Sequence, residues 1–254
     1  MFSYIYNSLI YQPLYNGLVF LMDIIPWADA GIAIIVLTLI VKLILFPLSK
    51  KAITTQLRMK GVEPELALIK EKYKEDKQEQ ARQTMGLYKK QGINPFSSIL
   101  LIFIQLPVIF ALYKVFLSSG LPSINTDLLY HFISVPAIVN IKFLNLIDIA
   151  GKSLILAIIA GVSTYIQIRF SLPPKPKVAP ATGSVPTPTS TSKTSSFKDD
   201  LARSMNIQMR YIFPVLAFFI SWSISGAIAL YWITSNIFTI GQEIVIRRGF
   251  KSKM

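Results

Sequence analysis

The chain has 254 residues, of which 52% are hydrophobic and 15% charged, and its formal net charge is +13. A mean hydropathy of +0.51 excludes a soluble domain of this size, because such a domain could not cover so much apolar surface. With no cysteine, the chain has no disulfide framework, thiolate metal site or lipid-modified N-terminal cysteine.

Lysine and arginine are distributed unevenly. Residues 1–41 contain none, residues 50–90 contain eleven, residues 118–151 contain only Lys142, and residues 247–253 contain four. Basic clusters that alternate with apolar runs follow the positive-inside pattern of membrane proteins rather than that of nucleic-acid binders. The sequence therefore predicts an all-α polytopic membrane protein with its N-terminus outside and its C-terminus in the cytoplasm.

Residues 1–26 are apolar but are interrupted by Asn7, Gln12 and Pro13. They have no basic n-region, which argues against a signal peptide. Their tyrosines favour a helix lying at the outer interface. An additional span, with the N-terminus inside, stays open as the alternative, although no basic residue would hold it there.

The first span is expected over residues 27–49, with Trp27 at the outer interface and Pro47 ending or kinking the helix. Lys42 lies inside this span, where an ammonium group costs about 2.5–3.5 kcal/mol on insertion scales. Thr38 lies four residues earlier on the same face. This pair favours a wet, protein-lined cavity, while snorkelling of Lys42 to the inner headgroups is the alternative.

Residues 50–94 predict a charged cytoplasmic helical hairpin. Pro64 suits a first helical turn, Asp76 followed by Glu79 suits a capping box, and Gly92 suits a helix end. The surface is either simply solvated or a docking site for anionic headgroups, ribosomal RNA or incoming chains. The candidate docking residues are Arg58, Met59, Lys60, Lys70, Lys72 and Lys74.

The second span is expected over residues 95–117, begun by Asn94-Pro95 and interrupted near its middle by Gln105 and Pro107. An amide at that depth needs a partner, so Gln105 serves either as interhelical glue or as cavity lining.

An outer loop, residues 118–151, precedes a third span over residues 152–171. The loop's His131 is accompanied by no nucleophile motif and is expected to face solvent. Tyr165 and Gln167 bring polar groups toward the inner end of the third span.

Residues 172–209 are rich in proline, serine and threonine and predict a disordered linker with a helix start. The apolar block 210–246 predicts two short spans, broken between Ser221 and Gly226. Short spans thin the surrounding bilayer. The second of them carries Trp232 and Asn236 on one face. Residues 247–254 form a basic tail.

No phosphate-binding loop, nucleophile elbow, zinc motif or intramembrane carboxylate pair is present, so no enzyme activity, catalytic residue, metal or cofactor is expected. Glu243, close to the inner end of the last span, is the only acid within a span core, which argues against an ion-coupled transporter. A buried cation with neutral polar neighbours instead suits the transient solvation of a polar segment of another chain.

Several stretches also carry a resemblance that covers nearly everything from residue 30 to 249. They are TLIVKLILFPLSKK, Met59 with Pro64 and Lys72-Tyr73, LYKKQGINPF, IQLPVIFALY, FLNLIDIAGKSLILAIIAG, MRYIFPV and SGAIALYWITSNIFTIGQEIVIRRG. In this order they resemble the YidC family of membrane-protein insertases, which includes mitochondrial oxidase-assembly and chloroplast thylakoid relatives. The large outer domain of many Gram-negative members is absent, as in the compact five-span form.

The resemblance implies a five-span core whose hydrophilic groove opens to the cytoplasm and the lipid. Lys42 stands where the family has an arginine. The lysine keeps the positive charge but cannot form the bidentate hydrogen bonds of a guanidinium group. The groove residues expected here are Thr38, Lys42, Gln105, Tyr165, Gln167, Trp232 and Asn236. Two departures are Ser97-Ser98-Ile99 after Asn-Pro and a longer Pro-Thr linker.

The predicted function is therefore an insertase and chaperone of a bacterial cytoplasmic membrane, which receives nascent membrane proteins and releases them sideways into the lipid bilayer. The Sec translocon and the ribosome are further candidate partners, and no specific nucleic-acid sequence is expected to bind. A small polytopic transporter or channel is the alternative.

Overall fold

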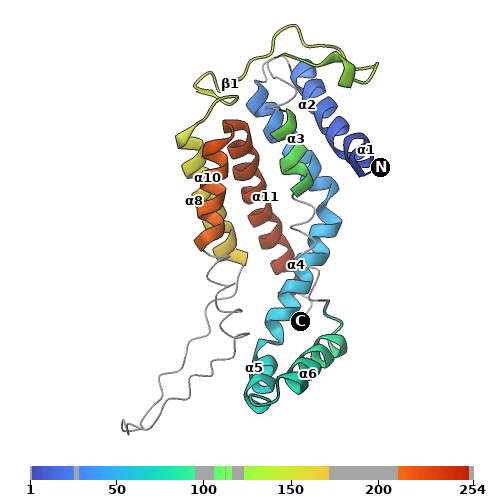
Figure 1. The fold of residues 1–254 in the computed structure, drawn as a ribbon, viewed down its shortest axis with the longest axis vertical. Coiled ribbons are helices and arrows are strands. Elements are labelled where there is room, and N and C mark those ends of the chain that lie inside the picture. Colours follow the sequence, from blue (N-terminus) through green and yellow to red (C-terminus); the bar gives the residue numbers. More distant parts are fainter. Residues whose placement is uncertain are drawn as a thin grey trace.

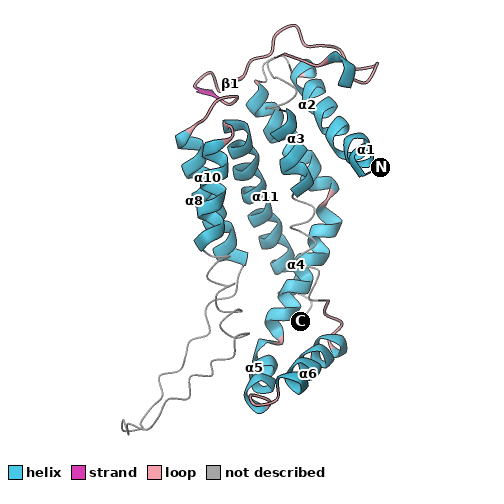
Figure 2. Cartoon of the chain, viewed as in Figure 1, coloured by secondary structure: helices cyan, strands magenta, loops and turns pink. Residues whose placement is uncertain are grey.

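The computed structural model describes residues 2–25, 29–94, 106–111, 113–115, 123–171 and 211–251. These residues are mostly helical, which confirms an all-α fold (Figure 2). Trp27, Gln105, residues 97–99 and the linker 172–209 lie outside the described residues. The elements are α1 Phe2–Tyr6, π-helix η1 Asn7–Tyr11, α2 Gln12–Ile24, α3 Ala30–Ile44, α4 Phe46–Gly61, α5 Glu63–Lys72, α6 Lys77–Lys90, a helix Leu106–Val115, 3-10 helix η2 Thr126–Leu128, β1 Lys142–Phe143, β2 Ile147–Asp148, α8 Leu154–Ser171, α10 Phe213–Ser223 and α11 Gly226–Lys251.

The N-terminal helices lie beside α3 (Figure 1). α2 buries Tyr15, Leu18 and Val19 almost completely. Gly17 allows this approach, since a Cβ there would lie 3.1 Å from Leu37 Cδ1. The N-terminal segment is therefore part of the helical core.

α3 and α4 form a bent pair with 65° between them. Asp29 caps α3 by accepting a hydrogen bond from the Ile32 amide at 2.9 Å. α3 ends at Ile44, and Pro47 stands in the first turn of α4. The interruption predicted from Pro47 is confirmed, because proline has no amide hydrogen to donate to the preceding turn.

α8, α10 and α11 pack side by side on the other side of α3 (Figure 1). The apolar block breaks between Ser223 and Gly226, as the sequence predicted, and α11 then continues to Lys251, five residues beyond 246. Gly161 of α8 allows close packing, since a Cβ there would lie 3.1 Å from Phe218 Cβ of α10.

Among the described residues, α8 alone is long and apolar enough to cross a bilayer, and the bent pair α3–α4 would be a second candidate. α10 has only 11 residues, and the helix Leu106–Val115 adjoins residues outside the description. The five predicted spans are therefore not established by helix length alone.

α5 and α6 pack on each other at the far end of the molecule (Figure 1), around Val62, Leu87 and Ile93. Asp76 caps α6 as predicted, accepting from the amides of Gln78 and Glu79. Glu79 instead holds Arg82, with Nε–Oε2 at 2.8 Å, so the capping box is half formed.

Gly92 ends α6 with φ +62°, and the Ile93 amide donates to Tyr88 O at 2.8 Å. This is the glycine-terminated end that the sequence indicated.

Residues 123–151, here called the cap, cross over one end of the bundle (Figures 1 and 2). They contain a two-residue antiparallel pairing, Lys142 with Asp148 and Phe143 with Ile147, which the sequence did not predict. His131 is exposed, as expected. Backbone hydrogen bonds join the cap to the helices, including Ala30 N to Asn140 O at 2.8 Å and Ala227 N to Ile149 O at 2.9 Å.

Candidate functional site: a cavity beside Lys42

A cavity of about 520 Å³ lies between α3, the helix Leu106–Val115, α10 and α11. α10 and Leu106–Val115 supply apolar walls, including Phe110, Phe213 and Leu216. Polar groups come mainly from α3 and α11. They are Thr38, Lys42, Ser235, Asn236, Thr239 and Gln242, joined by Ser49 of α4 and Gln167 of α8.

α3 contributes Thr38 and Lys42, one helical turn apart. Thr38 is 3% exposed, and its hydroxyl donates to Ile34 O at 2.6 Å. Lys42 is half-buried, and its Nζ donates to Thr239 Oγ1 at 3.3 Å. The ammonium group is therefore directed across the cavity toward α11.

α11 contributes a polar stripe with helical spacing. Trp232, Ser235, Asn236 and Thr239 follow one another at intervals of three, one and three residues, which places them on one face. Thr239 donates its own hydroxyl to Ser235 O at 2.7 Å while accepting from Lys42. Both hydrogen-bonding functions of this hydroxyl are therefore in use.

Asn236 also joins α11 to α8. Its Nδ2 donates to Ser163 Oγ at 3.0 Å and to Thr164 Oγ1 at 2.9 Å. Those hydroxyls in turn donate to Ala160 O. Asn236 thus borders the cavity and also serves as a buried hydrogen-bonded link between two helices.

Five of the seven predicted groove residues line this one cavity: Thr38, Lys42, Gln167, Trp232 and Asn236. Tyr165 is not among the lining residues, and its ring lies 6.4 Å from that of Tyr211. Gln105 is outside the described residues.

Sequence reasoning missed Ser49, Ser235, Thr239 and Gln242 as lining residues. For those on α11, the spacing from Trp232 was the available signal. Gln242 is 5% exposed, and its Nε2 has no hydrogen-bond partner among the described residues. This amide hydrogen is a donor that a ligand or water in the cavity could use.

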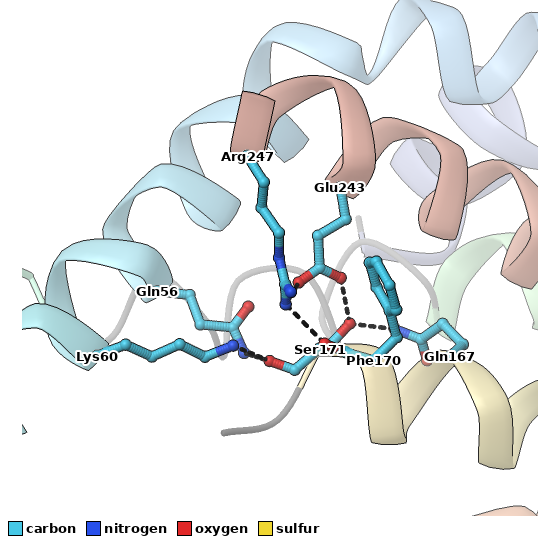
Figure 3. A network of polar contacts seen from close by, with 7 residues as sticks. All are labelled: Gln56, Lys60, Gln167, Phe170, Ser171, Glu243 and Arg247. Carbon is cyan, nitrogen blue, oxygen red and sulfur yellow. Dashed lines mark hydrogen bonds and ion pairs between the residues drawn. The ribbon is translucent and has the colours of Figure 1, made fainter. Parts of the chain in front are cut away.

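A polar network, here called the clasp, joins three helices at the end of α8 (Figure 3). Glu243 is 2% exposed; its Oε2 accepts from Ser171 Oγ and its Oε1 from Arg247 Nη2, both at 2.5 Å. Arg247 Nη2 also donates to Phe170 O at 2.6 Å. These contacts place a guanidinium group at the carboxyl end of a helix, where cations are stabilised.

α4 contributes two further groups to the clasp. Lys60 Nζ donates to Ser171 O at 2.6 Å, and Gln56 Nε2 donates to the same oxygen at 3.4 Å (Figure 3). Gln167, which lines the cavity, donates to Ser171 Oγ at 3.1 Å. The clasp and the cavity therefore share a residue.

The remaining predicted docking residues lie on α4, α5 and the turn after α5. Arg58, Lys70, Lys72 and Lys74 are exposed, whereas Met59 packs against the Val62 cluster. Lys60 is turned toward Ser171 instead. The exposed members form a basic surface that can attract anionic groups.

Comparison with known proteins covers almost the whole chain. Residues 20–253 match the family described as 60Kd inner membrane protein. A protein named membrane protein insertase YidC from Clostridium tetani is 31% identical over 223 residues, which is 88% of this chain and 84% of that protein. The protein of the same name from Fusobacterium nucleatum is 29% identical over 97% of this chain and 98% of its own length.

Longer relatives match as well. A protein named membrane protein insertase YidC from Alcanivorax borkumensis is 32% identical over 87% of this chain, but over only 31% of its own length. The chain thus spans about a third of the long relatives and more than four-fifths of the short ones. The family match, residues 20–253, includes the helices around the cavity.

Proposed function

The chain belongs to the 60Kd inner membrane protein family, and from this premise we propose that it is an insertase of the bacterial inner membrane. Relatives that match it over nearly their full length carry the name membrane protein insertase. The proposed activity is the transfer of nascent membrane proteins into the lipid bilayer. It involves no covalent chemistry.

The observation that carries the proposal is the position of Lys42 at a cavity with one polar and one apolar side. The ammonium group of Lys42 and the side-chain amide of Gln242 are the donors proposed for the acidic and backbone groups of an incoming segment. In hydrocarbon those groups would be unsatisfied, at a cost of several kcal/mol each. The apolar wall formed by α10 suits the hydrophobic part of the same client.

The membrane arrangement is part of the proposal. Five spans are formed by α3 with the start of α4, by the helix containing Leu106–Val115, and by α8, α10 and α11. The cap lies outside, and α5, α6 and the C-terminus lie in the cytoplasm. α10 has 11 residues and rises about 16 Å, so the bilayer of about 30 Å is expected to thin beside it.

The basic surface of α5 and its neighbours is proposed to receive partners before insertion. Exposed Lys70, Lys72 and Lys74 suit anionic headgroups, the ribosome or an acidic nascent chain. The Sec translocon is a further proposed partner for larger clients.

The test is complementation of an insertase-depleted cell with Lys42 variants, scored by insertion of a single-span reporter with an acidic or a neutral tail. Lys42→Ala should slow the acidic reporter at least severalfold and the neutral one much less, whereas Lys42→Arg should retain both. The matched control is Lys114→Ala, because Lys114 lies on another apolar helix and donates to Asn7 Oδ1 at 3.1 Å rather than lining the cavity. Equal insertion of both reporters by Lys42→Ala would refute the electrostatic step.

A further inference from the structure

We propose that the cap is a lipid anchor, whose apolar ridge enters the acyl-chain region of the outer leaflet. The ridge consists of Phe132, Val135, Ile138, Leu144 and Leu146. The inference rests on the proposed membrane arrangement and adds an interaction surface to it.

The five ridge side chains are all more than half exposed. Their exposed fractions are 70% for Phe132, 51% for Val135, 83% for Ile138, 57% for Leu144 and 82% for Leu146. Single exposed apolar residues are normal, whereas a contiguous apolar patch marks a partner or a membrane, and these five residues lie within 15 positions of the chain.

The ridge is held in place from its other side. Between the ridge residues, Ile133, Val139 and Phe143 pack against the core of the bundle. The cap thus alternates between apolar side chains that face the protein and apolar side chains that face away from it.

Hydrogen bonds fix this orientation. Asn16 Oδ1 accepts from the Tyr130 amide at 2.7 Å, and Asp29 Oδ2 accepts from the Leu144 amide at 2.7 Å. The Ala30 amide donates to Asn140 O at 2.8 Å. Because these contacts hold the backbone, the ridge side chains cannot turn inward without breaking them.

The scarcity of charged side chains in this segment favours lipid rather than water as its surroundings. From 128 to 147, Lys142 is the only lysine, arginine, aspartate or glutamate. A lysine can extend its ammonium to the headgroups while its neighbours stay in the acyl region. Asp127 and Asp148 stand just beyond the two ends of this apolar segment.

The length of α8 places the cap at the edge of the hydrocarbon region. α8 directly follows the cap (Figure 1) and has 18 residues, which correspond to about 27 Å of rise, close to the hydrocarbon thickness of about 30 Å. α8, which leaves the cap, exposes Leu154 and Ile155 in its first turn, so the ridge continues an apolar surface that the lipid already covers.

The absence of cysteine permits a direct test. The single-cysteine variants Ile138→Cys, Leu146→Cys, Ile155→Cys and Asp127→Cys are spin-labelled in the full-length protein and reconstituted into phosphatidylglycerol–phosphatidylethanolamine vesicles. Collision rates with oxygen, which concentrates in lipid, and with a water-soluble nickel chelate are measured by electron paramagnetic resonance. Asp127 is exposed on the same cap and serves as the water-facing control, while Ile155 serves as the lipid-facing one.

The expected result is an oxygen-to-nickel ratio at 138 and 146 severalfold above that at 127 and close to that at 155. A ratio equal to that at 127 would overturn the anchor, as would protection from both reagents, which would indicate a second protein copy or another protein partner. If the spin label at position 155 also collides more often with nickel than with oxygen, the proposed membrane arrangement itself fails. Failure at 138 and 146 alone leaves the insertase proposal standing, because that proposal is read from reporter insertion.

Discussion

The two ends of the helical bundle are held together by different chemistry. At the cap end the contacts are backbone hydrogen bonds and close apolar approaches, such as Gly226 N to Gly151 O at 2.8 Å and Gly31 against Phe143. At the clasp end they are side chains of α4 and α11 that hold the carboxyl end of α8, centred on Glu243 and Arg247. The cap end is held mainly by backbone groups and packing, with Asn16 and Asp29 as side-chain acceptors, whereas the clasp end contains an ion pair.

This difference shows where the protein can adjust without unfolding. Releasing the cap would break backbone pairing and uncover core residues such as Ile149, which is fully buried. Releasing the clasp would separate polar side chains, including the buried Glu243, which would need new partners or water in place of one another. The cavity shares Gln167 with the clasp, so the adjustable end is also the end that borders the proposed client site.

The largest effect is expected from Glu243→Ala, which leaves Arg247 and Ser171 without their buried partner. Removing one member of a buried ion pair costs about 3–5 kcal/mol, and the lower part of that range applies because the Arg247 side chain is 29% exposed. Unfolding of the detergent-solubilised protein, followed by circular dichroism, measures the change.

The matched control is Glu79→Ala, which removes the solvent-facing pair with Arg82, whose side chain is 77% exposed. Little change is expected there. Equal destabilisation by the two variants would show that burial does not distinguish the clasp from an ordinary surface pair.

The next effect tests the cap end through Gly31→Ala. A Cβ at this position would lie 2.9 Å from Phe143 Cβ and Cγ, and overpacking of this kind costs about 1–3 kcal/mol. The loss should be insensitive to salt, unlike that at the clasp.

Gly86→Ala is its control, because no atom lies within 4 Å of the added Cβ and alanine is favoured in a helix interior. It should raise stability by about 0.5–1 kcal/mol. Combining Gly31→Ala with Phe143→Leu should cost less than the sum of the two single changes, and strict additivity would argue against the close contact.

A smaller loss of stability is expected from Asn236→Ala, which removes a link between α11 and α8. The two hydrogen bonds to Ser163 and Thr164 are together worth about 1 kcal/mol, because interhelical polar contacts in membranes average about 0.6 kcal/mol each. The same unfolding assay applies. A loss above that of Glu243→Ala would reverse the ranking of polar sites.

The smallest effect concerns pH at the α6 surface. The hydrogen bond from Arg82, assisted by Gln83, lowers the pKa of Glu79 below its ordinary value of 4.5. The resulting stabilisation is therefore present above pH 4.5 and is lost as the pH falls through the lowered pKa. Carboxyl chemical shifts followed by nuclear magnetic resonance should show titration below 4.5, and Arg82→Gln should move it upward.

Local features of this fold were predictable from the sequence. Pro47 marks the break between α3 and α4, Asp76 and Gly92 bound α6, and the serines before Gly226 mark the break between α10 and α11. Each is a short-range backbone effect that proline, a capping side chain or glycine produces alone.

The missed features depend on partners far along the chain. The clasp joins Gln56 to Ser171 and Ser171 to Glu243 across 115 and 72 residues, and no local pattern signals such pairs. The β1–β2 turn places Leu144 and Asn145 at φ 51° and 60°. Leucine is rarely found there, so a propensity argument would have rejected that turn.

The 65° bend between α3 and α4 joins two separate, regular helices. Helical hydrogen bonds are kept on both sides of the bend, from Leu45 N to Val41 O and from Ser49 N to Leu45 O, both at 3.0 Å. Lys42 stands in the last turn of α3, just before the bend, and Lys60 near the end of α4 contributes to the clasp. A rotation of α4 about this bend would therefore move Lys60 of the clasp relative to Lys42 of the cavity.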